Sequence, residues 1–85
     1  MHEYYADYIG SRVALDSNVT TTSLFFGRNG EDPPFNVRVL LPDTVLKEIY
    51  FLLRQAIQQR EEVAGAKIQV RESFMQKMGI APEDL

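Results

Sequence analysis

The stretch that decides the fold is FNVRVLLPDTVLKEIYFLLRQAI, residues 35–57. Every second residue from Phe35 to Leu41 is apolar, which predicts a strand with one buried face, although Leu40 lies on the other face. After Pro42 the apolar residues recur every three or four positions, which is the period of a helix. The change of period at Pro42 therefore predicts a strand followed directly by a helix.

The predicted helix begins beside Asp43 and Thr44, whose side-chain oxygens can cap the first free amides, and runs about 30 Å to Gly65. Phe51 and Leu52 widen its apolar surface, and Phe51 lies away from the main stripe. The stripe itself, which we expect to pack on a sheet, consists of Leu46, Ile49, Tyr50, Leu53, Ala56 and Ile57.

The first half of the chain predicts an antiparallel meander of three or four strands. Aromatic and β-branched residues mark further strands before residue 27: one is expected to end at Gly10, a second covers 13–15, and a third covers 19–26. The turn-rich residues 27–34 predict a hairpin connection. The polar run 20–23 is expected on an edge or on a solvent-facing side of its strand.

Beyond the long helix, residues 66–70 either begin a last strand or lead directly into a short helix. The apolar spacing predicts a small amphipathic helix over 71–78, ended by Gly79 in the left-handed conformation, with Ile80 contacting Met75. Residues 81–85 are expected to be a flexible acidic tail. The whole therefore predicts a single α+β domain over residues 1–80.

Composition and charge exclude several classes of protein. Nine basic residues are spread singly among twelve acidic ones, for a net charge of −3, which disfavours nucleic-acid binding. With no cysteine and only His2, we expect no metal, no cofactor and no catalytic cysteine. Because no apolar run reaches about 18 residues and the first ten residues carry acids, we expect a cytoplasmic protein without membrane contact.

Self-association is expected because a small meander leaves open edges and a second face that 85 residues cover poorly. A homodimer or tetramer solves this problem, with a different protein partner as a further option. The alternative is that the same apolar residues complete the core of a monomer. The candidate interface residues are Phe25, Leu40, Phe51, Leu52, Phe74, Met75 and Met78, together with the tyrosines at positions 4, 5 and 8.

Several short segments carry a resemblance to known proteins: Tyr5-Ala6-Asp7-Tyr8, Arg12 to Asn18, Leu24-Phe25-Phe26-Gly27, Val37-Arg38-Val39 and Leu41-Pro42. Together with the helix behind them, they resemble a family of small bacterial domains of unknown function. This resemblance implies a bacterial origin and supplies no catalytic residues. The order of strands followed by a long helix also resembles the architecture of SecB-type export chaperones, which implies the holding of unfolded clients.

Three functions follow as hypotheses. The first is a non-enzymatic, self-associating protein–protein interaction module with no catalytic residues. The second is a small SecB-like holdase chaperone. The third is an enzyme with a weakly marked carboxylate site, in which Asp7 and Asp16 face each other across a hairpin.

Overall fold

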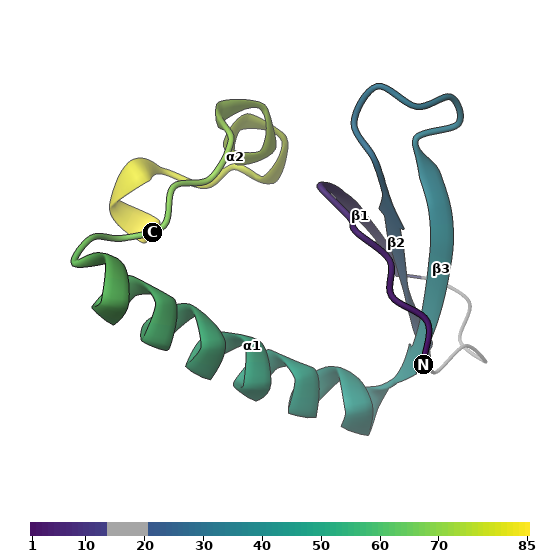
Figure 1. Cartoon of the computed structure of the whole chain (residues 1–85), viewed down its shortest axis with the longest axis horizontal. Helices are drawn as coiled ribbons and strands as arrows, with labels where there is room; N and C mark the ends of the chain where they lie inside the picture. The colour runs from purple at the N-terminus through teal and green to yellow at the C-terminus, as the bar shows by residue number, and fades with distance from the viewer. Residues whose placement is uncertain (14–20) are drawn as a thin grey trace. The chain divides into compact units, whose positions relative to one another are not determined.

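The computed structural model describes residues 1–13 and 21–85 and confirms the α+β class (Figure 1). Asp16, Thr20 and most of segment 12–18 lie outside the described residues. The elements are β1 (Tyr8–Val13), β2 (Thr21–Gly27), β3 (Phe35–Pro42), α1 (Asp43–Ala64), α2 (Glu72–Met78) and a 3₁₀ turn (Pro82–Asp84). The chain divides into two compact units, Met1–Ile49 and Tyr50–Leu85.

The described strands form one antiparallel sheet in the order β1-β2-β3, with β2 in the centre. The expectation that the first strand ends at Gly10 is wrong, because β1 continues through Gly10 to Val13. A Cβ atom at Gly10 would lie 2.8 Å from the ring of Phe35. Glycine therefore makes room for an aromatic ring that lies over an edge strand, rather than ending the strand.

A register shift between β2 and β3 moves Phe35 to the face opposite the one expected. Phe26 pairs with Val37, but the next residue, Gly27, pairs with Phe35, so β3 holds one extra residue. The Phe35 ring consequently lies 5.1 Å from that of Tyr8 and 5.8 Å from that of Phe25. The alternation expected for β3 holds for its later residues, while Phe35 joins an aromatic cluster on the other face.

Apart from Gly27, the buried residues among those described in the sheet lie near the end of β3 that leads into α1. Leu41 is 5% exposed and pairs with Thr22, which is also buried. Ser23 is buried as well, and its Oγ accepts hydrogen bonds from Nε and Nη2 of Arg38 at 3.3 and 3.1 Å. The expected edge or solvent-facing position of this polar run is therefore wrong for Thr22 and Ser23, because their strand is the central one.

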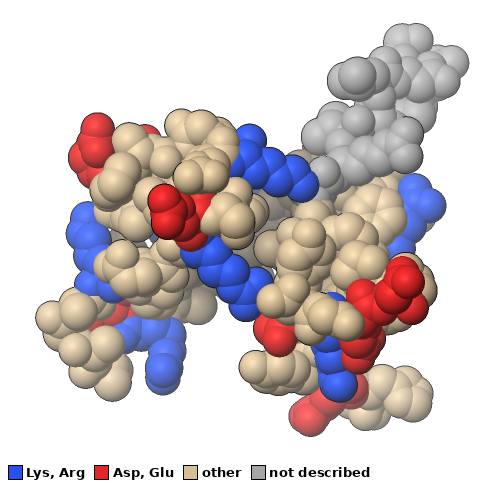
Figure 2. Space-filling model, turned by 90° about the horizontal axis from the view of Figure 1, so that it is seen from above, with Lys and Arg blue, Asp and Glu red and all other residues tan. Residues whose placement is uncertain are grey.

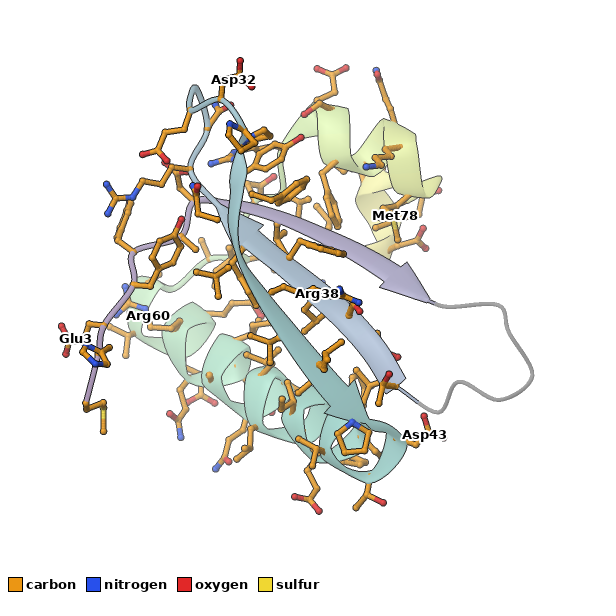
Figure 3. All side chains as sticks on the ribbon, turned by 90° about the vertical axis from the view of Figure 1, so that its right-hand side faces the viewer. Glu3, Asp32, Arg38, Asp43, Arg60 and Met78 are labelled. Carbon is orange, nitrogen blue, oxygen red and sulfur yellow. The ribbon has the colours of Figure 1, made fainter. Side chains whose placement is uncertain are left out.

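The N-terminal segment is attached to the β2–β3 connection. The backbone N–H of Asp7 donates to the Gly27 carbonyl at 3.2 Å, and Oδ1 of Asp7 accepts the N–H of Asn29 at 2.7 Å. Nε of Arg28 donates to the carbonyl of Tyr5 at 3.2 Å. The connection itself is the expected hairpin, closed by a bond from Arg28 N–H to the Pro34 carbonyl at 3.0 Å. Asp32 lies at its tip (Figure 3).

The long helix α1 is confirmed with bounds close to those expected. It follows Pro42 directly, begins at Asp43 and spans 22 residues, or about 33 Å. It ends before Gly65, whose φ of +67° and hydrogen bond from its N–H to the Glu61 carbonyl at 2.9 Å form the termination. No residue of α1 is buried, so its packing on the sheet stays a prediction.

The chain after α1 shows which of the two structures predicted for residues 66–70, a last strand or a direct connection to a short helix, is present. Residues 67–70 form no strand and lead directly into α2, with the N–H of Ile68 bound to Oε2 of Glu61 at 2.9 Å. The predicted end of α2 is confirmed: Gly79 has φ +68°, and Ile80 N–H donates to the Met75 carbonyl at 2.9 Å. Within 81–85, Asp84 accepts the N–H of Ala81 in the 3₁₀ turn, while the flexibility of this tail stays a prediction.

We predict that Gly27→Ala destabilises the protein by about 3 kcal/mol or more, at or beyond the upper end for overpacking. A Cβ atom there would lie 1.5 Å from the Pro34 carbonyl oxygen, so the register shift beside it could not form. The control is Gly30→Ala, which meets nothing within 4 Å and carries only a backbone cost of about 1–2 kcal/mol at φ +91°. Urea unfolding measures both, and equal losses would contradict the steric explanation.

A second prediction concerns the attachment of the N-terminal segment. Asp7→Ala removes the acceptor of the Asn29 N–H and should lower the free energy of unfolding by about 1 kcal/mol. The matched control is Asp32→Ala, an exposed aspartate of the same connection, for which we expect a change within about 0.5 kcal/mol. Thermal unfolding followed by circular dichroism compares the two. A control as damaging as Asp7→Ala would show that loop charge, not this hydrogen bond, matters.

Candidate interaction surface

Among the described residues, α1 carries more exposed large apolar side chains than any other element. Good helix formers fill the rest of α1, and helix propensity alone does not explain why its apolar side chains recur on one side. Within Tyr50–Ala64 the stripe includes Tyr50 at 53%, Leu53 at 56% and Ile57 at 48% exposure. Leu46 and Ile49, in the first turns of α1, are half-buried. Such a stripe normally marks the contact face of a helix.

The stripe is wider than the residues first assigned to it. Leu52 and Val63 extend one side and are 65% and 83% exposed. Val63 was missed by the sequence reasoning, which did not follow the apolar period past Ile57. At 100° per residue, Val63 falls close to Leu52 and Ala56. A count of apolar positions over the full length to Gly65 would have found it.

Phe51 lies off the stripe, as predicted, and is 54% exposed. Its ring makes an edge-on contact with that of Tyr50, with 5.2 Å between the centroids. This pair joins the stripe to the side of the helix on which Phe51 lies. Aromatic pairs of this geometry are favourable and rigid, which suits a contact surface. Phe51 and Leu52 are thus two exposed candidates on different sides of one helix.

The other candidate interface residues divide into exposed and half-buried groups. On α2, Met78 is 55% exposed while Phe74 and Met75 are half-buried. On the sheet, Leu40 is 56% exposed, whereas Phe25 is half-buried between the ring of Phe35 and the guanidinium of Arg38. The strand register places Phe25 and Leu40 on the same face of the sheet.

An open hollow lies at the N-terminal segment and is lined by Glu3, Tyr4, Tyr5 and Arg28. The guanidinium of Arg28 lies 5.8 Å from the ring centroid of Tyr4 and 6.0 Å from that of Tyr5. The same side chain also approaches Glu31 at 4.0 Å. The Arg28 guanidinium thus already has aromatic and acidic neighbours in its own chain. We therefore interpret this arrangement as the attachment of the N-terminal segment and not as a ligand site.

The carboxylate hypothesis gains no geometry from the structure. Asp7 precedes β1, and its carboxylate accepts the N–H of Asn29, a structural contact of the hairpin connection. Asp16 lies outside the described residues, so their pairing stays untested. Within residues 1–13 and 21–85, no three acidic or histidine side chains come together in a way that could hold a metal ion.

Charge on the surface is mixed. Lysine and arginine side chains lie among aspartates and glutamates on the face visible in Figure 2, without a patch of either sign. Among the described residues, no helix combines the length and apolar character needed to cross a bilayer. The features that stand out are therefore apolar side chains on α1 and α2 rather than a charged site.

The resemblance to small bacterial domains and to SecB-type chaperones stays a prediction. Comparisons of the chain with protein-family models, with curated proteins and with solved structures found no match. The geometry described above is therefore the basis on which a function is proposed.

Proposed function

We propose that this chain is a non-enzymatic protein–protein interaction module that associates with copies of itself. One observation supports the proposal above others: taken by itself, the unit Tyr50–Leu85 contains no buried residue. An isolated amphipathic helix is marginal in water and takes most of its stability from the packing of its apolar face. The stripe on α1 therefore needs a covering surface, and a second copy supplies one.

The energetic scale supports association. Leu52, Leu53, Ile57 and Val63 are 48–83% exposed, and covering them is worth roughly 1–2 kcal/mol each. On two copies the sum is about 8–16 kcal/mol, against an association cost of about 4–15 kcal/mol. These four positions alone therefore bring a dimer into the range of measurable affinity, before any contribution from Tyr50 or Phe51.

A client-holding function is the second candidate. The exposed Met78 on α2, together with the exposed leucines of α1, is the kind of adaptable apolar surface that binds unfolded chains. A client enzyme diluted from urea distinguishes the two functions. A holdase suppresses aggregation of the client enzyme at an equimolar ratio. A self-associating module leaves this aggregation unchanged, because a second copy covers its stripe.

We predict that Leu53→Glu weakens self-association at least about ten-fold, because the new charge would be desolvated in the contact. The full-length protein should have a mass of at least twice 9.7 kDa by light scattering behind a sizing column. The variant should shift toward the single-chain mass. Leu53 lies near the middle of the stripe, so this position is central to any contact made by that face.

The matched control is Gln58→Glu, which adds the same charge to the same helix on the side away from the stripe. It should keep the mass of the parent protein. A parent protein of single-chain mass across the micromolar range would overturn the proposal. An equal loss in both variants would show that the added charge, and not the stripe, controls assembly.

A further inference from the structure

We infer that α1 pairs with α1 of a second copy in an antiparallel arrangement, with a two-fold axis that crosses the stripe beside Ala56, level with Gln55 along the helix. This inference rests on the proposed self-association and names its contact. The exposed part of the stripe runs from Tyr50 to Val63, about 20 Å of a helix of about 33 Å, whereas α2 has only seven residues, about 10 Å. A second α1 matches the stripe in length and in chemistry, and the following charges and sizes fix its direction.

Arg60 favours the antiparallel direction. By helical angle it lies within the stripe, between Leu53 and Val63, on α1 (Figure 3). A parallel pair in register places Arg60 against Arg60 of the partner subunit, two like charges at an apolar contact. In the antiparallel pair Arg60 instead faces Tyr50 of the partner subunit, where a guanidinium and an aromatic ring attract each other.

The acidic C-terminal end of α1 also favours the antiparallel arrangement. Glu61 and Glu62 lie in its last turn, where no basic residue is present, so they face the negative end of their own helix dipole. Antiparallel pairing brings Glu61 toward the N-terminal half of the partner helix, away from the negative end of another dipole. Glu61 then lies next to Lys47 of the partner subunit, since both residues belong to the same side of the helix, two heptads apart.

Side-chain size is also compatible with this axis. Near the two-fold, Ala56 lies next to Ala56 of the partner subunit, and two small residues allow the helices to approach closely. Larger residues follow on either side of this point. Leu53 faces Ile57 of the partner subunit, and Ile49 faces Val63 of the partner subunit. The apolar residues on either side of Ala56 can therefore pack against each other in an antiparallel pair of identical helices.

The absence of cysteine from the sequence makes the test direct, because each introduced thiol is unique in its chain. Ala56→Cys, Ile49→Cys and Val63→Cys are made in the full-length protein and treated with a short bis-maleimide. Ala56→Cys alone should give covalent dimer. Val63→Cys alone and Ile49→Cys alone should not, since two copies of these positions would lie about 24 and 18 Å apart along the axis.

A mixture of Ile49→Cys and Val63→Cys chains should cross-link, about ten-fold or more above either variant alone. Gln58→Cys, on the outer side of α1, is the control and should stay uncross-linked. Circular dichroism checks that each variant keeps the parent helix content.

Each other outcome is decisive. Cross-linking of every stripe variant with itself would mean a parallel pair and would overturn the inference. No cross-linking in a protein whose mass is that of a dimer would overturn the inference but leave self-association intact, with the contact elsewhere. A single-chain mass for the parent would overturn both.

Discussion

The close approach of the Pro34 carbonyl to Gly27 is the contact on which the sheet depends. Only a residue without Cβ tolerates it, and it allows β3 to take up one extra residue against β2. That shift turns Phe35 toward Tyr8 and Phe25 and over Gly10. The same hairpin connection offers the Gly27 carbonyl to Asp7. One backbone contact thus determines which face of the sheet Phe35 occupies, how its ring lies over the edge strand β1, and where the N-terminal segment is attached.

Against this organised sheet, the second unit of the chain is built differently. Its helices have local capping at Gly65 and Gly79 but no buried residue. Local signals at these two glycines therefore define where its helices end, while nothing within that unit fully buries an apolar side chain. This contrast is why the proposed function concerns what the stripe of α1 contacts. A catalytic or metal-binding site has much less support among the described residues.

The sequence predicted the features that depend on short-range periodicity. The change at Pro42 located β3 and α1, and the spacing around Phe74 with Gly79 located α2 and its termination. Features that depend on contacts between distant residues were missed. The turn of Phe35 to the other face follows from a backbone fit with β2, and the burial of Thr22 and Ser23 follows from the central place of their strand. The sequence identified the apolar candidate residues, but which of them are exposed depends on the three-dimensional structure.

The lack of buried residues between Tyr50 and Leu85 has a consequence for order itself. A helix stabilised mainly by its apolar face has a fraying equilibrium that depends on how often that face is covered. Under the proposed self-association, folding and binding of this half of the chain are one process with one free energy. Its helix content is then expected to depend on protein concentration, as wherever a ligand binds only the folded form. The sheet has buried residues of its own, so we expect its order not to depend on protein concentration in this way.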